Sequence, residues 1–290
     1  MNTSISIKRC GDNKTLELRE KEGVKYLVFP RLEELGVVDH MFSTRLGGVS
    51  CGYYSEMNLS YTRGDKKENV DENYRRIASV LGHGRSLNDF VLTFQTHTTN
   101  IKVVTESDRG KGPLIPRDYT DIDGLITNIP GIILGTFHAD CPPVYIIDPV
   151  KKAIGLVHSG WKGTRGKIAL KAIEKMNNEY GTNPKDLVCA IGPSICGDCY
   201  EIGEDVASEF ASSFSKVDLN SAKILVPYKE GKYKLYLWNA IKATLLEAGV
   251  LKDNIIVTDI CTKCNPDLLF SHRVHHDDRG NLCAFLSLKK

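Results

Sequence analysis

The chain has 290 residues, 41% of them hydrophobic, which suits one large or two small globular domains with a sizeable buried core. Its 38 lysines and arginines nearly balance 36 aspartates and glutamates, and a net charge of +2 does not indicate a nucleic-acid or membrane surface. The first residues lack the continuous apolar core of a signal peptide, and no segment is long and apolar enough to cross a bilayer. We therefore expect a cytoplasmic protein whose partners are neither nucleic acids nor membranes.

Cysteine is the residue type that most restricts the chemistry. The nine cysteines occupy positions 10, 51, 141, 189, 196, 199, 261, 264 and 283. An odd number of cysteines in a chain without an export signal favours free thiols or metal ligands over a disulfide framework.

Short strands and one helix are expected in the first third of the chain. Residues 5–29 contain three apolar runs separated by Gly-Asp-Asn and Glu-Gly turns, which predicts a meander of three short strands. Residues 71–82 place apolar side chains on one helical stripe and end in Gly82, which predicts a helix that stops there. Residues 90–97 and 100–106 are strand-like runs with few residues between them, so we expect an antiparallel pair with His97 at a strand end.

The remainder of the chain predicts helices and buried strands. Apolar residues recur at helical spacing over residues 164–180, 203–214 and 235–248. Apolar runs without clean alternation predict strands covered on both faces, at residues 131–137, 144–148, 153–157, 187–192 and 254–259. Sheets flanked by helices place the fold in the α/β or α+β class.

Two of these strands form a hairpin that brings a cysteine near a histidine. Asp-Pro-Val-Lys-Lys joins residues 144–147 to 153–157 and is too short for the crossover that parallel strands need. A turn centred near Val150 places Cys141 and His158 side by side at the open end, with Cβ atoms about 5 Å apart. Titratable side chains that converge at strand ends indicate a metal site or a catalytic dyad. Either residue alone is more typical of a buried core.

An ordered set of motifs resembles a known family. The motifs are Ser-Thr-Arg-Leu-Gly-Gly-Val-Ser with a following Asn-Leu-Ser, then FQTH, DIDGLIT, HADCPPV, HSGWKGT, GPSIC with CYEIG, and CTKCNPDLLFSHR. Together they resemble the laccase-domain or YfiH family, whose members are also called peptidoglycan editing factors and multi-copper polyphenol oxidoreductases. The resemblance implies an α+β fold, a four-layer α/β/β/α sandwich with mixed sheets, that forms a single catalytic domain over residues 1–290. It also implies a purine nucleoside phosphorylase that cleaves adenosine, inosine, guanosine and methylthioadenosine and deaminates adenosine.

The resemblance further implies one catalytic zinc ion with two histidine ligands and one cysteine ligand. In this sequence the ligands are His97 of FQTH, Cys141 of HADC and His158 of HSGWKG. The hairpin argument pairs two of these three residues independently of the family. Three protein ligands leave one zinc position open, and zinc lowers the pKa of bound water to about 7, which gives a hydroxide able to attack C6 of adenine.

Five further residues are candidates for contacts with a purine nucleoside and phosphate. Arg45, in a glycine-rich turn, offers bidentate donors to phosphate, with a solvated turn residue as the alternative. Lys162 is a second candidate for neutralising phosphate. Family position suggests Asn58 as a substrate-binding residue and Gln95 and Asp123 as contacts to the base or ribose.

Two residues beside Cys141 have different expectations. Strand alternation turns both His138 and Asp140 away from the metal, so His138 is not expected to be a ligand. We place Asp140 with the catalytic residues because its carboxylate is suited to orienting a ligand. A purely structural cap is the alternative.

Three rival functions remain open at the sequence level. A histidine–histidine–cysteine set also suits copper in a polyphenol oxidoreductase, but the chain has none of the His-x-His pairs of multicopper oxidases, so copper is disfavoured. Cys141 activated by His158 suits a metal-free cysteine hydrolase. Cys196/Cys199 and Cys261/Cys264 are Cys-x-x-Cys pairs suited to a zinc-binding module, but their separation far exceeds that of ordinary zinc ribbons, which favours reduced thiols.

Overall fold

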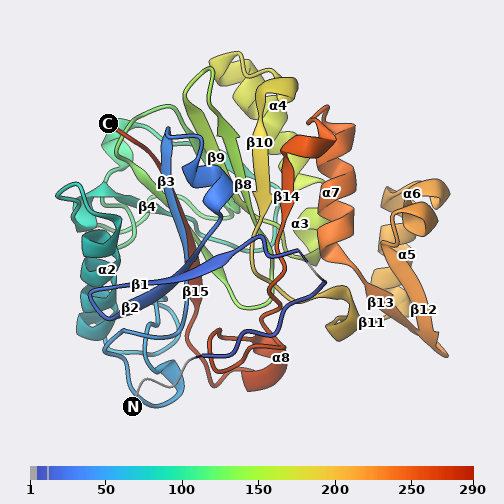
Figure 1. The fold of residues 1–290 in the computed structure, drawn as a ribbon, viewed down its shortest axis with the longest axis horizontal. Coiled ribbons are helices and arrows are strands. Elements are labelled where there is room, and N and C mark those ends of the chain that lie inside the picture. Colours follow the sequence, from blue (N-terminus) through green and yellow to red (C-terminus); the bar gives the residue numbers. More distant parts are fainter. Residues whose placement is uncertain (1–4, 12) are drawn as a thin grey trace.

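Two mixed β-sheets pack face to face, with helices on their outer faces (Figure 1). The computed structural model describes residues 5–11 and 13–290, without the side chains of residues 216–218. Within this described part, the layers follow the order helix, sheet, sheet, helix, which confirms the α+β sandwich. Among the same residues, no helix has both the length and the apolar character needed to span a membrane.

The first sheet has six strands in the described part of the chain. Their order is β1 (Glu17–Lys21), β2 (Val24–Val28), β3 (Val38–Ser43), β15 (Leu282–Leu288), β7 (Ile133–His138) and β4 (Phe90–Leu92). Only the edge pair β4–β7 is parallel, and the other neighbours are antiparallel.

The second sheet also has six strands among the described residues. Their order is β14 (Ile255–Val257), β10 (Val188–Ile191), β8 (Pro143–Asp148), β9 (Ala153–His158), β6 (Gly124–Thr127) and β5 (Ile101–Val103). Both edge pairs, β10–β14 and β5–β6, are parallel, whereas the central strands are antiparallel.

Strands with continuous apolar runs contribute to two cores at once. In β8, Tyr145 and Ile147 point into the core between the sheets, while Val144 and Ile146 point into the core under the outer helices. In β15, residues 282, 284 and 286 face the inter-sheet core and residues 283 and 285 face the opposite side. Side chains alternate between the faces of a strand, so the absence of polar alternation in these runs reflects burial on both faces.

Helices cover the outer faces of the two sheets. The described α-helices are α1 (Pro30–Glu33), α2 (Lys67–Leu81), α3 (Trp161–Arg165), α4 (Ile168–Tyr180), α5 (Glu204–Ser213), α6 (Lys216–Ser221), α7 (Leu237–Glu247) and α8 (His272–His275). The apolar stripe of α2 packs on the first sheet, and α4 and α7 cover the second. Gly82 caps α2 with a positive φ of 73°, as the sequence predicted.

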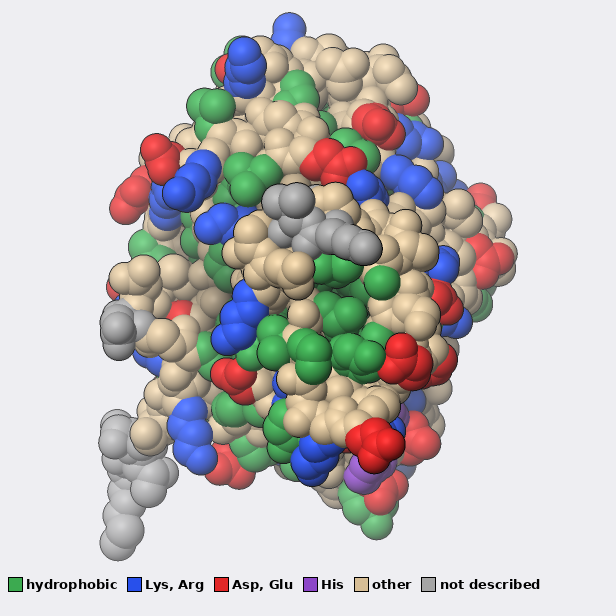
Figure 2. All heavy atoms as spheres, turned by 90° about the vertical axis from the view of Figure 1, so that its right-hand side faces the viewer, with side chains coloured by type: hydrophobic (Ala, Val, Ile, Leu, Met, Phe, Trp, Pro, Cys, Tyr) green, Lys and Arg blue, Asp and Glu red, His purple; other side chains and the backbone are tan. Residues whose placement is uncertain are grey.

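A small third sheet extends from one side of the sandwich. It consists of β11 (Glu201–Gly203), β13 (Lys232–Leu235) and β12 (Leu225–Lys229), and it packs with α5 around Phe210. Figure 2 shows this side of the molecule, where basic and acidic side chains are interspersed among apolar ones.

Three expectations from the sequence are wrong in detail. Residues 5–10 form no strand; they contribute only an isolated bridge from Arg9 to Ile260. The predicted antiparallel pair at residues 90–106 does not form, because β4 pairs with β7 in one sheet and β5 pairs with β6 in the other. The helix predicted over residues 164–180 is two helices, since Lys167 between α3 and α4 has a positive φ of 56°.

The antiparallel β8–β9 hairpin is confirmed, with a register slightly different from the expected one. Pro143, and not Cys141, lies opposite His158, and Cys141 lies just before the first paired residue, at the open end of the hairpin as expected. Pro142 still accepts a backbone hydrogen bond from Ser159 at 2.8 Å, which keeps the two chain segments adjacent beyond the ladder.

Candidate metal centre and adjoining cavity

Three side chains meet where the chain passes between the two sheets. His97 lies on the connection from β4 to β5, Cys141 lies on the connection from β7 to β8, and His158 ends β9. Two of these segments therefore run from the first sheet to the second. The crossing explains why His97, distant in sequence, reaches the other two residues even though the predicted strand pairing is wrong.

The three ligand atoms form a compact group. They lie within 4.8 Å of one another, and the Cys141 Sγ to His97 Nε2 distance is 3.9 Å. Zn–S and Zn–N bonds of about 2.3 and 2.0 Å in tetrahedral geometry separate the ligand atoms by about 3.5 Å, so an ion fits with small side-chain adjustments.

Gly160 makes room for this group. A Cβ atom at this position would lie 2.9 Å from His97 Cδ2, 3.0 Å from Cys141 Sγ and 3.3 Å from His158 Cε1. These separations are shorter than, or at the lower limit of, ordinary van der Waals contact. A side chain at position 160 would therefore push against all three residues, which fits a space kept for an ion between them.

Asp123 positions the two histidines through hydrogen bonds. Its buried carboxylate accepts a hydrogen bond from His158 Nδ1 at 2.8 Å and from the backbone N–H groups of Thr96, His97 and Thr98 at 2.9–3.1 Å. Because Nδ1 of His158 is engaged, Nε2 is the nitrogen left for a metal ion. Asp123 is fully buried and does not line the adjoining cavity, and its contact with base or ribose stays a prediction.

The negative charge of the Cys141 thiolate and the positive charge of His158 stabilise each other. Burial opposes ionisation of Cys141, but the charge of His158 and hydrogen bonds from His158 and His97 outweigh it and lower the pKa of the thiol to about 6. Burial also disfavours the charged form of His158, yet Cys141 and Asp123 together raise its pKa to about 9. A thiolate is the form of cysteine that binds metals and attacks electrophiles.

The two neighbours of Cys141 point elsewhere. Nδ1–H of His138 donates to the Cys141 carbonyl oxygen at 2.9 Å, and Nε2 accepts from the Thr136 hydroxyl at 2.7 Å. Asp140 accepts from the Thr262 hydroxyl at 2.5 Å and from the Arg273 backbone N–H at 2.7 Å. His138 is thus occupied by hydrogen bonds, and Asp140 anchors the segment that carries Cys141 without touching a histidine of the group.

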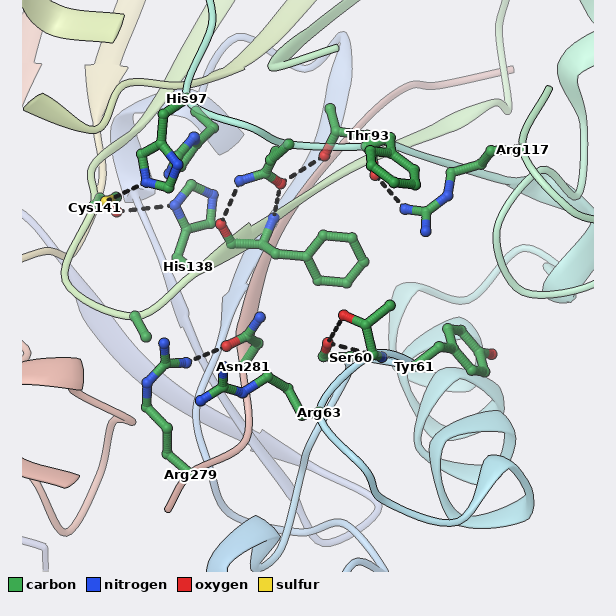
Figure 3. A pocket seen from close by; sticks show the side chains of 16 residues that line it. Ser60, Tyr61, Arg63, Thr93, His97, Arg117, His138, Cys141, Arg279 and Asn281 are labelled. Atoms are coloured by element: carbon green, nitrogen blue, oxygen red, sulfur yellow. Dashed lines mark hydrogen bonds between the residues drawn. The ribbon is translucent and has the colours of Figure 1, made fainter. Parts of the chain in front are cut away.

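A cavity of about 360 Å³ opens from the metal-ligand group. His97, Cys141 and His158 line one part of it, and Figure 3 shows Arg63, Arg279 and Asn281 across the cavity from His97 and Cys141. Its volume lies within the range of small-molecule sites in proteins.

Two arginines of this wall have unused donors. Nε of Arg63 and Nε of Arg279 are both buried without a hydrogen-bond partner among the described residues. Burial and the charge of nearby Arg63 lower the pKa of Arg279 to about 10. Both guanidinium groups line the cavity, and their positive charges favour an anion there, with Arg63 also paired to Asp277 at 3.4 Å.

Several candidates from the sequence lie outside the cavity wall. Arg45 donates from Nε and Nη1 to the carbonyl oxygens of Ser55 and Pro266, and its guanidinium lies over the ring of Phe270. Lys162 is exposed on α3. Neither residue lines the cavity.

Two further candidates have scaffold contacts. Asn58 is buried and holds the backbone of Ser60 and Asn281, while Gln95 lines the cavity but engages both backbone groups of Phe137 through its amide. Sequence reasoning missed Arg63 and Arg279. Their one local signal is that each precedes a glycine in a polar loop.

Comparisons with known proteins agree with this fold and identify the family. The family model described as multi-copper polyphenol oxidoreductase laccase matches residues 39–289. A protein named purine nucleoside phosphorylase YlmD from Bacillus subtilis is 32% identical over 253 residues, which cover 86% of this chain and 88% of that protein. A protein named purine nucleoside phosphorylase from Deinococcus radiodurans is 38% identical over 253 residues, which cover 87% and 90%.

A solved structure gives the same result in three dimensions. The crystal structure of YlmD from Geobacillus stearothermophilus has a TM-score of 0.87 and 31% identity to this chain, and the match covers 96% of this chain and 100% of that one. The fold and the match over most of the sequence define the class of the protein as a laccase-domain sandwich. The chain belongs to the laccase-domain, or YfiH, family.

Proposed function

We propose that the protein is a zinc-dependent purine nucleoside phosphorylase that cleaves adenosine, inosine, guanosine and methylthioadenosine and also deaminates adenosine. The observation that carries the proposal is the meeting of a three-ligand group and two arginines with unused donors in one cavity. The names of the similar proteins from Bacillus subtilis and Deinococcus radiodurans support the nucleoside substrate. We further propose that residues 1–290 act as one catalytic domain.

In this proposal, different residues of the cavity bind the phosphate and the purine. Arg63 and Arg279 bind phosphate, because their guanidinium groups offer directed donors to its oxygens. Phe94 and Phe137 supply apolar surface for the purine. Bound zinc would act as a Lewis acid and lower the pKa of a coordinated water to about 7.

The protein positions the three ligands through hydrogen bonds. Asp123 holds the Nδ1 proton of His158 and the backbone around His97, and the depressed pKa of Cys141 keeps its sulfur available as a thiolate. In phosphorolysis, a phosphate oxygen replaces the base at C1′ of the ribose and yields free base and ribose 1-phosphate. In deamination, water replaces the amino group at C6 and releases ammonia.

Product analysis tests this function. Purified protein is incubated with adenosine and phosphate, and adenine, inosine and hypoxanthine are separated. We expect adenine that depends on phosphate, and inosine that does not. Arg279→Met should raise KM for phosphate, whereas Arg75→Met, on the exposed side of α2, should leave it unchanged. Absence of adenine and inosine at full zinc occupancy would refute the proposal.

A metal-free cysteine hydrolase is the second candidate, and the lowered pKa of Cys141 favours it. Alkylation by iodoacetamide separates the two functions. A metal ligand is protected by zinc, so zinc should slow the modification of Cys141 strongly. Equal alkylation rates with and without zinc would favour the hydrolase.

Copper is the remaining metal to distinguish from zinc. Among the described residues, three or more potential ligands gather at only two places, and the cavity holds just one of these groups. A multicopper oxidase needs several groups of copper ligands, and the cavity has one. Elemental analysis of protein purified without added metal should therefore find zinc. Stoichiometric copper with little zinc would instead indicate a polyphenol oxidoreductase.

A further inference from the structure

A second group of potential metal ligands lies outside the catalytic cavity. Cys196 precedes and Cys199 ends a single turn, Gly197–Cys199, between β10 and β11, and Cys261 and Cys264 follow β14. The four Sγ atoms lie within 4.8 Å of one another, although the two pairs are far apart in the sequence. The fold brings the two pairs together, so their long separation in the sequence does not prevent them from sharing a metal ion.

The spacing of the sulfurs suits a metal ion better than a disulfide. Sγ of Cys199 and Sγ of Cys264 are 3.5 Å apart, and all four cysteines are free thiols. A disulfide requires about 2.05 Å between the sulfurs. Four sulfurs bound tetrahedrally to zinc at about 2.3 Å are separated by about 3.8 Å, close to the observed spacing.

The backbone around the sulfurs is shaped for thiolates. The N–H of Cys196 donates to Sγ of Cys261 at 3.3 Å, and the N–H of Cys199 donates to the carbonyl oxygen of Cys196 at 3.1 Å. Gly197 is required in the first turn, because a Cβ there would lie 2.0 Å from the ring of Tyr236. The second turn is held by Asn265, whose side chain donates to the Cys261 carbonyl oxygen at 2.8 Å.

Burial also suits a structural site. Cys196 and Cys261 are buried, whereas Cys199 and Cys264 are half-buried, which leaves a route for an ion to enter. Four cysteine ligands fill the coordination sphere of zinc and leave no position for substrate, so such a site stabilises structure and does not catalyse.

We propose that Cys196, Cys199, Cys261 and Cys264 bind a second zinc ion in a closed four-thiolate site. Binding forms four Zn–S bonds and releases the four thiol protons to solvent, and no electrons are transferred. Because the ion would join two segments that are far apart in the sequence, its binding energy contributes directly to stability.

The proposed ion also has a consequence for the catalytic loop. Ile195, next to Cys196, donates its N–H to the carbonyl oxygen of Asp140 at 3.0 Å. Thr262, next to Cys261, donates its hydroxyl to the Asp140 carboxylate at 2.5 Å. Both cysteine turns therefore hold the residue that precedes Cys141, so the four-thiolate site positions this loop.

Zinc content tests the proposal independently of activity. Protein purified under reducing conditions is analysed for zinc by mass spectrometry, alongside three variants. We expect two zinc ions in the wild type, one in Cys141→Ala and one in the double variant Cys199→Ser/Cys264→Ser. Cys10→Ser is the matched control, since Cys10 packs against the cluster without belonging to the group of four, and it should keep two ions.

The outcomes separate this site from the proposed catalytic one. If Cys141→Ala contains no zinc, or if intact mass shows a Cys199–Cys264 disulfide in the native protein, the four-thiolate site is refuted. If the wild type holds one ion that is lost in the double variant, the four-thiolate site stands and the zinc of the proposed function fails. The Cys141→Ala result decides the question even if the double variant does not fold.

Discussion

Asp123 orients two of the three proposed metal ligands through its hydrogen bonds. It receives hydrogen bonds from the ring of His158 and from three consecutive backbone N–H groups around His97. Removing its charge leaves the His158 ring free to change tautomer, and an uncharged side chain cannot stabilise the same proton.

Asp123→Asn should therefore weaken zinc binding about 10–100-fold, which is typical for a residue that orients a metal ligand. Zinc affinity is measured by competition with a chelating dye. Asp121→Asn is the control, because Asp121 lies in the same loop and contacts the Thr96 hydroxyl but neither histidine. Equal losses in the two variants would mean that the loop as a whole, and not the His158 contact, determines affinity.

At the residue scale the sequence predicted some of the site and missed the rest. Cys141 and His158 were predictable because a short loop joins their strands, and short loops restrict register. His97 followed only from family resemblance. Arg63 and Arg279 were missed because loops with little local pattern bring them to the cavity from distant parts of the chain.

At the scale of elements, the connections that cross from one sheet to the other determine where the site forms. Residues 90–106 contain two strand-like runs in close succession, and local pattern favours pairing them. Instead, β4 pairs in parallel with β7 in the first sheet, and β5 pairs in parallel with β6 in the second. These long-range pairings cannot be read from the local sequence. The hairpin β8–β9 was predictable because its partners are local.

An aromatic cluster attaches α2 to the first sheet. The rings of Tyr74, Phe90 and Phe285 pack edge to face, with centroids 5.3–6.1 Å apart. Phe285→Ala should lower the free energy of unfolding by about 3–5 kcal/mol, because a buried ring is lost and a cavity remains. Urea unfolding measures this change.

Tyr53→Ala is the control for this cluster. Tyr53 is 64% exposed, so its removal should change the free energy of unfolding by less than about 0.5 kcal/mol. A loss in Phe285→Ala as small as that of the control would show that the helix does not depend on these rings.

At the scale of the whole molecule, buried histidines make stability depend on pH. His40 accepts a hydrogen bond from the Phe29 N–H at 2.9 Å, and burial, with smaller effects of Arg19 and Lys289, lowers its pKa to about 3. The unfolded chain protonates His40 near pH 6.5. Between these values only the unfolded chain binds the proton, so stability falls as the pH decreases from about 6.5 towards 3.

The variant His40→Gln should reduce this pH dependence. The amide oxygen can still accept from Phe29 but does not titrate, so the variant should be spared about 2 kcal/mol of the destabilisation between pH 7 and pH 5. Urea unfolding of both proteins at the two pH values gives the difference. His138, whose pKa burial also lowers, contributes equally to both proteins and cancels. Identical pH profiles would contradict the assignment to His40.

The fold as a whole was more predictable than the placement of its parts. Runs that are apolar on successive residues indicated strands covered on both faces, and β8 and β15 show why, because each serves two cores. The layering of the sheets was implied by the family resemblance and not by periodicity, which reports burial but not which strands are neighbours.

We propose that His97, Cys141 and His158 together hold the metal ion that the reaction requires. The most direct measurement is the rate of phosphate-dependent inosine cleavage by His97→Ala, compared with His272→Ala, which alters an exposed histidine outside the cavity wall. His97 lies on an exposed loop, so the variant should fold, lose one zinc equivalent and be at least about 100-fold slower than the wild type. A His97→Ala protein that keeps wild-type activity, as His272→Ala is expected to do, would contradict the account.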